Sequence, residues 1–520
     1  MCHWLRRLRQ WHTFSKSSNP VNDSMTNLVP LLVAIPLGTA FVIPLANRLH
    51  PRASDVLGSL APFCLLVMSL VLLNHEITYH MGDWPTPNGI DLRVDSLTSL
   101  MLITINGLAL IVSIYSFEFL RTFTDRHKYY SLLLLMVAGA NGVVLTADLF
   151  NLYVFMEIAT IASYALVAFG GDAEDFEASF KYAVFGGLSS SLILIGIGLV
   201  YGVTGTLNMS HLASRLAESS QQTAPLQFAL ALFFCGFGVK TAMVPFHAWL
   251  PDAYPAAPAP VSALLAGIVS KVTGLYVLAR LFFNVFGVTP ELLMLMQWAG
   301  GITMVVGGLI ALGQTDIKRL FAWSSVSQVG LILLALGFGT TWGIVGALFH
   351  LINNAVFKSL LFLGSGRAEM TAGTRDLRQM RGLGRTIPIT AATCLVGSLS
   401  ISGIPPFNGF WSKLIIVVAA VQAGHIEWAA LVVVMSIVTL AYQLKVQKEA
   451  FYSSASEAEE ETAGAGSRSL WDEEPVFMAI PMIILAVGCV ALSLLVVSGL
   501  ERPVLVGPAA EVLRRGVDVW

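Results

Sequence analysis

Residues 236–260 read GFGVKTAMVPFHAWLPDAYPAAPAP, and this stretch is the most informative about the fold. It continues an apolar run long enough to cross a bilayer, yet Lys240 stands inside it, five residues before Pro245. A proline removes a helical hydrogen bond and frees carbonyl groups, which is tolerated at bilayer depth only where protein or water satisfies them. The stretch therefore predicts a transmembrane helix that is broken beside a charged side chain.

The same combination recurs at residues 402–414, which read SGIPPFNGFWSKL. Here Pro405 and Pro406 interrupt a second apolar run, and Lys413 follows seven residues after the second proline. Broken helices at membrane depth mark the ion site in many transporters. Two of them, each beside a lysine, indicate that this chain moves an ion.

The whole chain has the composition of a membrane protein. Its 520 residues are 55% hydrophobic and 12% charged, with a mean hydropathy of +0.73, and the charged share is about half that of a soluble protein. The net charge of −2 gives no indication of nucleic-acid binding. A membrane-crossing helix needs about 20 apolar residues, so the sequence predicts an all-α polytopic protein with about fourteen spans. We place them at 27–47, 55–74, 97–119, 129–147, 149–170, 179–202, 226–247, 259–283, 292–313, 320–338, 342–364, 386–423 (one broken span), 427–446 and 476–499.

The two broken spans, the seventh and the twelfth, suggest an internal repeat. Grouping spans four to eight and nine to thirteen makes each broken helix the fourth of five. Because five is odd, the second unit begins on the opposite side of the membrane, and the sequence predicts two inverted five-helix repeats. The predicted segments are a disordered extension at 1–26, peripheral helices at 27–128 with a polar hairpin at 75–95, repeats at 129–283 and 292–446, a polar loop at 447–475, and a last helix with a tail at 476–520.

Basic residues predict the orientation. Most loop lysines and arginines follow odd-numbered spans, whereas the loops after even-numbered spans hold little beyond Arg93 and Arg215. Loops rich in lysine and arginine stay in the cytoplasm. We therefore expect both termini to lie outside.

Lone ionisable residues inside the spans carry the chemistry. Lys240, Lys271, Lys358 and Lys413 each stand alone in an apolar run, and Glu157 is the only charge in its span. Such residues are functional candidates by default, because a charge at bilayer depth is costly unless it faces a polar interior. A carboxylate beside a lysine stays ionised, and separating the two changes the affinity of the lysine for a proton. Glu157 and Lys240 are thus predicted to form a switch; a static ion pair that locks two helices is the alternative.

A polar stripe is predicted on the eleventh span. His350, Asn354 and Lys358 are spaced at i, i+4 and i+8, so they follow one helix face over about 12 Å and can order a chain of water molecules. His247, two residues after Pro245, either bridges the seventh span to this stripe or caps carbonyls freed at the break.

Other residue patterns limit the chemistry further. Asp148, at the end of the fourth span, is more typical of a solvated or capping residue than of a catalytic one. The cysteines show no CxxC spacing, and only His247 and His350 lie well inside spans, too few for the axial ligands of two haems. The phosphate-binding pattern GxxxxGK[ST] is absent, because Val239 stands where glycine is required. We expect no cofactor, metal or nucleotide site on this chain.

Five segments resemble the antiporter-like membrane subunits shared by respiratory complex I, the Mrp-type sodium/proton antiporters and the membrane-bound hydrogenases. They are FNLYVFMEIATIASYAL (150–166), KTAMVPFHAWLPDAYPAAPAPVSALLAGIVSK (240–271), QTDIKRLFAWSSVSQVG (314–330), HLINNAVFKSLLFL (350–363) and SGIPPFNGFWSKL (402–414). The resemblance runs over about residues 25–500. Chain length and the FNLYVF segment favour the Mrp D-type subunit.

The resemblance implies roles by matching position. Glu157 and Lys240 match the switch pair, Lys413 matches the terminal lysine, and the central relay matches Lys271 together with His350 and Lys358. Gln328 is a departure, because many complex I relatives have histidine at this position of the SSVSQVG segment.

The implied function is proton translocation by one subunit of a larger complex in a membrane, the bacterial inner membrane being favoured. The implied partners are other antiporter-like and small hydrophobic subunits, and the translocated ions are protons, with sodium left open. A subunit of a proton-pumping NADH dehydrogenase or hydrogenase is the alternative. A scaffold that only transmits conformational change is a third reading, which the buried lysines disfavour.

Overall fold

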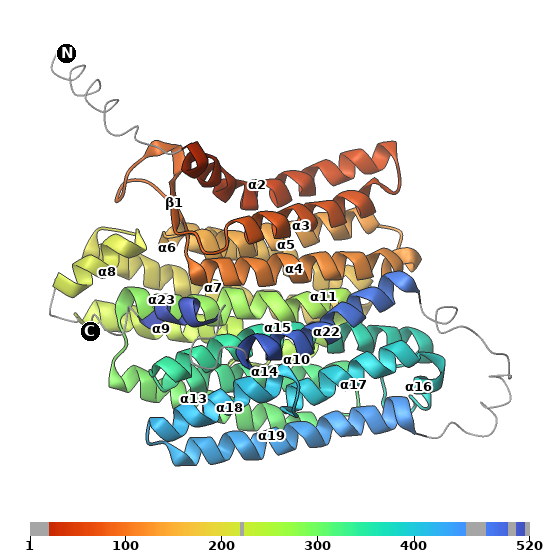
Figure 1. Ribbon diagram of the computed structural model, residues 1–520. Helices are drawn as coiled ribbons and strands as arrows, with labels where there is room; N and C mark the ends of the chain where they lie inside the picture. The colour runs from red at the N-terminus through yellow and green to blue at the C-terminus, as the bar shows by residue number, and fades with distance from the viewer. Residues whose placement is uncertain (1–19, 219–222, 454–474, 498–505, 515–520) are drawn as a thin grey trace, which may run out of the picture.

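The computed structural model describes residues 20–218, 223–453, 475–497 and 506–514, which form a bundle of long helices lying side by side (Figure 1). The first half contains α2 (Pro20–Leu49), α3 (Ala53–Val71), α4 (Ser96–Phe119), α5 (Arg126–Leu145), α6 (Leu149–Val167), α7 (Ala173–Thr204), α8 (Met209–Glu218), α9 (Ala224–Thr241), α10 (Leu250–Ala256), α11 (Ala259–Leu264) and α12 (Val277–Leu281). The second half contains α13 (Pro290–Gly313), α14 (Ile317–Gly337), α15 (Thr341–Ala372), α16 (Leu383–Thr386), α17 (Pro388–Ser402), α18 (Asn408–Gln422), α19 (Ile426–Val446), α22 (Val476–Val497) and α23 (Val506–Arg514). Short 3-10 turns lie at Met81–Asp83, Leu120–Thr122 and Ala168–Gly170.

Thirteen helices in the described ranges are long and apolar enough to cross a membrane. Two shorter apolar helices, α17 and α18, lie where the sequence predicts one interrupted span. Because membrane-depth backbone must satisfy its own hydrogen bonds, helices are the form such apolar segments take. The predicted all-helical, polytopic fold is confirmed.

The most enclosed helices are those that carry the central polar residues. The segment Ala259–Phe286 is buried along its whole central stretch, and α14 and α15 are nearly so. The segment is built from α11 and α12 with three π-helical turns, η5 (Leu265–Val269), η6 (Lys271–Tyr276) and η7 (Phe282–Phe286). Such π-turns are frequent at functional sites, and Lys271 begins the second of them.

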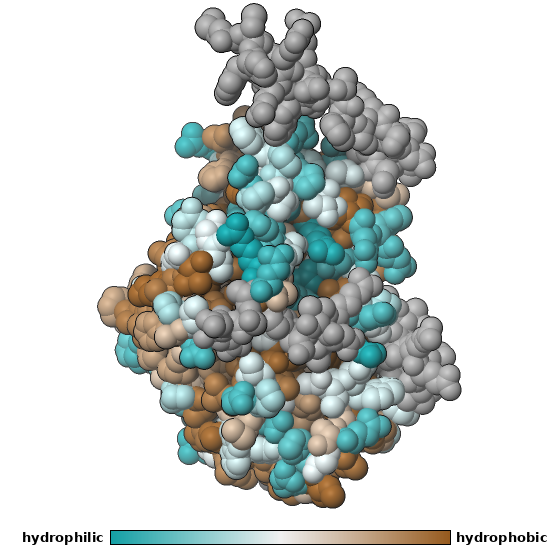
Figure 2. Space-filling model, turned by 90° about the vertical axis from the view of Figure 1, so that its left-hand side faces the viewer, coloured by the Kyte–Doolittle hydropathy of each residue, from teal (hydrophilic) through white to brown (hydrophobic). Residues whose placement is uncertain are grey.

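The end of the bundle near the N-terminus of α4 carries the extramembrane elements. Strands β1 (Ile77–His80) and β2 (Asp91–Val94) pair antiparallel, with Ile77 opposite Val94, inside the segment for which the sequence predicts a hairpin. The amphipathic helices α8 and α23, which the sequence reading missed, lie at the same end (Figure 1). Figure 2 views this end and shows hydrophilic residues gathered near its centre.

Several predicted boundaries are wrong. The predicted extension 1–26 ends too late, because α2 already begins at Pro20, where proline is well tolerated as a first helical residue; residues 1–19 lie outside the described ranges. The predicted loop 447–475 begins too early, because α19 continues into η8 (Gln447–Tyr452). The buried Ala450 and Phe451 extend the packed face of this helix. Residues 454–474 lie outside the described ranges.

Candidate functional site

The predicted switch pair meets at the contact of three helices. Glu157 on α6, Ser190 on α7 and Lys240 in the last turn of α9 converge on one point. Lys240 Nζ lies 3.5 Å from Glu157 Oε1 and 3.2 Å from Ser190 Oγ. The Ser190 hydroxyl donates to the same carboxylate oxygen. The ammonium, the hydroxyl and the carboxylate thus form a closed triad.

The two charges of this triad differ in exposure. The Lys240 side chain is 3% exposed, whereas that of Glu157 is 23% exposed. Glu157 is therefore less buried than Lys240, although it too is the only charge in its span. Val154 and Ile161, three residues before and four residues after it, are exposed apolar side chains of the same helix face. Glu157 lies at the edge of an uncovered apolar surface, because α6 is a peripheral helix.

The break before α10 lies directly after Lys240. Helix α9 ends at Thr241, and Ala242 has a positive φ of 60°. The carbonyl of Val239 accepts from the backbone N–H of Ala242 at 3.0 Å and from the indole N–H of Trp249 at 2.8 Å. The Trp249 side chain therefore ties the segment after the break to the end of α9.

His247 lies within this break but does not bridge to the stripe on α15. Its ring packs against Trp323 of α14, with centroids 5.2 Å apart, and its Nδ1 has no hydrogen-bond partner. The imidazole instead interacts with the backbone of Pro245. The bridging expectation is wrong, and the contact agrees with the capping alternative.

Lys271 lies at the centre of the bundle and is fully buried. Its Nζ lies 3.4 Å from Ser270 Oγ, and that hydroxyl lies 3.2 Å from the phenol oxygen of Tyr254. Tyr254 also donates to the carbonyl of Leu265 at 3.0 Å. The amine thus begins a short line of hydroxyl groups.

The polar stripe of α15 is fully buried. His350 contacts Gln328 Oε1 of α14 through Nε2 and Ser412 Oγ of α18 through Nδ1, both at 2.9 Å. At the other end, Lys358 Nζ donates to the carbonyl of Phe321 at 2.8 Å. Lys271 is within electrostatic range of both His350 and Lys358.

Asn354 stands between His350 and Lys358, one helical turn from each. Both polar atoms of its side chain are buried and have no hydrogen-bond partner. A buried amide without partners is costly, and a water molecule is its usual partner in proteins. This geometry supports the expectation of ordered water along the stripe.

Lys413 lies beside the second break. Its Nζ donates to the carbonyl of Ser402, the last residue of α17, at 3.3 Å. Gly403 follows with a φ of +82°, and a Cβ at this position would lie 2.9 Å from Lys413 Cδ. Pro405 and Pro406 lie in the connection to α18.

A pair of asparagines ties this second break to the polar stripe. Asn408 donates to Asn353 Oδ1, and Asn353 donates to the carbonyl of Asn408, both at 3.0 Å. Ser400 donates to Asn408 Oδ1. Because Asn353 belongs to α15, the break is fixed to the helix that carries His350 and Lys358.

Asp148 has a capping role. It is the N-cap of α6, and its Oδ1 accepts from the backbone N–H of Asn151 at 2.8 Å. Burial raises the pKa of this carboxyl above its ordinary value, although backbone hydrogen bonds from Asn151 and Phe150 oppose the shift. It makes no contact with the lysine axis, in agreement with the capping interpretation of its sequence position.

Sequence reasoning missed the uncharged partners of the axis, namely Ser190, Ser270, Tyr254 and Ser412. A serine in a transmembrane span carries no signal of its own, because it also bonds its own helix backbone. The sequence singles out Gln328 only because it replaces a histidine of the resembling family pattern. The sequence did not reveal its contact with His350. Within the described ranges, no three His, Cys, Asp or Glu side chains form a metal-binding group.

Two broken or interrupted helices around a line of buried lysines define a polytopic membrane protein of the antiporter-like class. Residues 146–439 match the family model described as the transmembrane region of NADH:quinone oxidoreductase and Mrp antiporter proteins. The chain belongs to this family and is an integral membrane protein.

Known proteins of two kinds are similar over nearly the whole chain. The N-type subunit of the NADH-quinone oxidoreductase of Desulforudis audaxviator is 33% identical, covering 90% of this chain and 96% of that protein. The D-type subunit of the Na(+)/H(+) antiporter of Alkalihalophilus pseudofirmus is 33% identical, covering 84% and 89%.

Similar solved structures come from a respiratory membrane complex and from a Mrp complex. A chain of the archaeal membrane-bound sulfane sulfur reductase has a TM-score of 0.84 at 32% identity, covering 94% of this chain and 98% of that chain. A chain of a Mrp complex from a Dietzia species has a TM-score of 0.83 at 29% identity, covering 95% and 98%. The resemblance inferred from the sequence motifs is confirmed.

Proposed function

We propose that this chain is a proton-translocating subunit of a multisubunit cation/proton antiporter of the Mrp type. The observation that carries the proposal is the triad of Lys240, Glu157 and Ser190, from which further buried lysines continue across the bundle. Four buried ammonium groups are too costly to be kept for packing alone. The antiporter D-type relatives support the choice of transport class.

In the proposed mechanism, the charge state of one lysine controls the next. While Glu157 stays close, it favours the protonated form of Lys240; when the two separate, the buried amine releases its proton toward Lys271. The like charges of Lys271 and Lys358 repel one another, so a proton arriving at one favours release from the other. The line from Lys358 through Asn354 and His350 then leads toward Lys413.

The half-buried position of Glu157 supports assembly with other membrane subunits. A carboxylate at the edge of an apolar surface would face lipid in an isolated chain, which is unfavourable at bilayer depth. We therefore propose that antiporter-like and small membrane subunits are the partners, and that the complex lies in a bacterial inner membrane with both ends of this chain outside. We propose no cofactor on this chain.

The test is to replace Lys240 with methionine in the assembled complex and to measure sodium-driven proton movement in everted membrane vesicles with a pH-sensitive dye. Lys240→Met should abolish transport while the complex still assembles. Lys128→Met is the matched control, because Lys128 forms an exposed ion pair with Asp125. Normal transport by the assembled Lys240→Met complex would eliminate the switch and favour a scaffold role.

A redox-driven complex is the second candidate, which the oxidoreductase and sulfane sulfur reductase relatives favour. Purifying the tagged chain in mild detergent distinguishes the two. Small hydrophobic partners without flavin or iron–sulfur proteins support the antiporter, whereas peripheral redox subunits support the alternative.

A further inference from the structure

A second ion pair lies outside the lysine axis, on the end of the bundle that carries the basic loops. Lys318 in the first turn of α14 contacts Glu369 of α15, with Nζ 2.7 Å from Oε2. The Lys318 side chain is 5% exposed, and its Nζ also lies 3.4 Å from the carbonyl of Ala257. A helix-end anchor in contact with water has no need for such burial.

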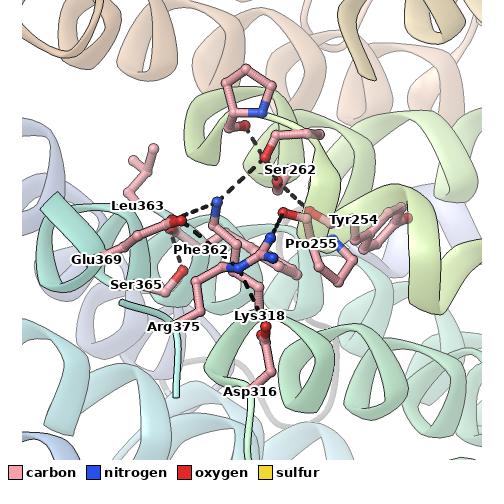
Figure 3. A network of polar contacts seen from close by, with 12 residues as sticks. Tyr254, Pro255, Ser262, Asp316, Lys318, Phe362, Leu363, Ser365, Glu369 and Arg375 are labelled. Carbon is pink, nitrogen blue, oxygen red and sulfur yellow. Dashed lines mark hydrogen bonds and ion pairs between the residues drawn. The ribbon is translucent and has the colours of Figure 1, made fainter. Parts of the chain in front are cut away.

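Arg375 gives the carboxylate a second cation. Its Nε lies 3.9 Å from Glu369 Oε1 and 3.3 Å from Asp316 Oδ2, and its NH1 donates to the carbonyl of Pro255 at 2.9 Å. Figure 3 shows the contacts from Glu369 to both Lys318 and Arg375. Arginine stays charged, whereas a buried lysine can lose its proton. Of the two partners of Glu369, only Lys318 can therefore change its charge.

This pair lines a cavity of about 680 Å³ that is rich in carboxylates. The charged lining residues are Asp172, Glu174, Asp175, Lys318, Glu369 and Arg375. Four carboxylates against two cations give a formal charge of 2 − 4 = −2. A cleft with a net negative charge concentrates counter-ions, so this cavity attracts protons and other cations.

Two polar routes lead from the pair toward the central lysines. Phe321, one turn after Lys318 on the same helix, provides the carbonyl that holds Lys358. On the other side, the carbonyl of Ala257 accepts from both Lys318 and Ser262. The Ser262 hydroxyl also lies 2.7 Å from the carbonyl of Tyr254, and the phenol oxygen of Tyr254 contacts Ser270 beside Lys271.

We propose that Lys318 and Glu369 form a gate through which protons pass between this cavity and the central lysines. A hydronium ion in the cavity protonates the Glu369 carboxylate and leaves as water. The Lys318 ammonium, now without a charged partner, passes its proton through water to a neutral amine at Lys358 or Lys271. Glu369 then returns its proton to the Lys318 amine, which restores the ion pair.

This inference depends on the proposed transport function, so the test includes a reference on the axis. Proton movement is measured in vesicles containing the whole complex with Glu369→Gln, Lys318→Met or Lys271→Met. Glu177→Gln is the matched control, because Glu177 forms an exposed pair with Lys181 on the same end. We expect Glu369→Gln and Lys318→Met to slow transport about tenfold or more at unchanged subunit content.

A purely structural ion pair would give a different pattern. The double variant Lys318→Met/Glu369→Gln replaces the pair by neutral side chains of similar size, so an anchor predicts normal transport once the complex assembles, whereas a gate predicts slow transport. Glu369→Asp keeps the charge, and partial recovery of the rate and of its pH profile is expected. The groups that face Glu369 are Lys318, Arg375 and the cavity carboxylates of α7, and these are unchanged in Glu369→Asp.

The possible results distinguish failure of the proposed gate from failure of the proposed transport function. Normal transport in Glu369→Gln together with loss in Lys271→Met overturns the gate and leaves the proposed function standing. Normal transport in Lys271→Met overturns the central relay itself. If Glu369→Gln does not assemble, normal transport by the double variant overturns the gate.

Discussion

Gln328 on α14 and His350 on α15 are joined by a 2.9 Å hydrogen bond between Oε1 and Nε2, deep inside the bundle. Because the amide oxygen only accepts, the imidazole donates from Nε2 and leaves Nδ1 to face the hydroxyl of Ser412. Gln328 thus fixes the tautomer and the orientation of the only histidine on the polar stripe. Glutamine at position 328 therefore still orients His350 through a hydrogen bond.

Replacing Gln328 with leucine should slow proton transport about tenfold, because His350 would lose the acceptor that orients its ring. Gln328→Glu keeps an acceptor and should retain much of the rate. The measurement is dye-monitored proton movement in everted vesicles at matched subunit content. Equal rates for the two variants would contradict the orienting role.

Removal of the hydroxyl of Ser190 should weaken the switch without abolishing it. Ser190→Ala takes one hydrogen-bond partner from Lys240 and one donor from Glu157, but the two charges remain in contact. We expect slower transport than in the unmodified complex and faster transport than in Lys240→Met. Ser191→Ala is the control, since the neighbouring hydroxyl bonds only its own helix and is exposed.

A substitution of Asn354 is expected to lower transport without lowering thermal stability. An apolar residue of similar size in place of a buried, unpartnered amide is expected to be neutral or stabilising. Asn354→Leu should therefore leave the melting temperature of the purified complex unchanged or raised, while transport falls because the water site is lost. A fall in both quantities would indicate a structural role instead.

Asp95 provides a prediction about stability and pH. Burial opposes its ionisation, but the contact with the guanidinium of Arg280 and the hydrogen bond from Thr98 outweigh burial, so the pKa of Asp95 lies below its ordinary value of 3.8. A lowered pKa means that the pair stabilises the fold at pH above about 4. This stabilisation is lost as the pH falls through the lowered value.

Asp95→Asn should accordingly reduce the thermal stability of the detergent-solubilised complex at pH 7, by about 3 kcal/mol for a broken buried pair. The difference from the unmodified protein should shrink as the pH falls from about 4 through the lowered pKa of Asp95, where the original carboxyl also becomes protonated. Thermal unfolding at neutral, mildly acidic and strongly acidic pH checks the trend. A difference independent of pH would show that packing, and not charge, holds Asp95.

Gly403→Ala tests the support of Lys413. The added methyl group meets Lys413 Cδ at 2.9 Å, and the φ of +82° disfavours any side chain. We expect a lower melting temperature and slower transport, because the amine is displaced from the carbonyl of Ser402. Gly424→Ala is the control: it has a similar φ of +81° but nothing within 4 Å of the added methyl group. Equal transport in the two variants would contradict the role of this contact.

The helical membrane fold and most of the charged axis can be predicted from the amino-acid sequence alone. Apolar runs of about 20 residues have few alternatives to a helix in a bilayer, and a lysine such as Lys271 is conspicuous in such a run because its burial is costly. Proline pairs such as Pro405 and Pro406 likewise reveal an interruption. The inverted relation between the two five-helix units, inferred from parity alone, stays a prediction.

The contacts between side chains of different helices could not be predicted from the sequence, because they depend on how the helices pack. Helix packing brings Ser190 to Glu157 across 33 residues and Ser412 to His350 across 62. An uncharged hydroxyl or amide in an apolar span gives no recognisable sequence signal, because its role depends on a hydrogen-bond partner from another helix. The exposure of Glu157 and the pairing of Lys318 with Glu369 were hidden for the same reason: periodicity describes one helix, whereas burial and contact are properties of several helices packed together.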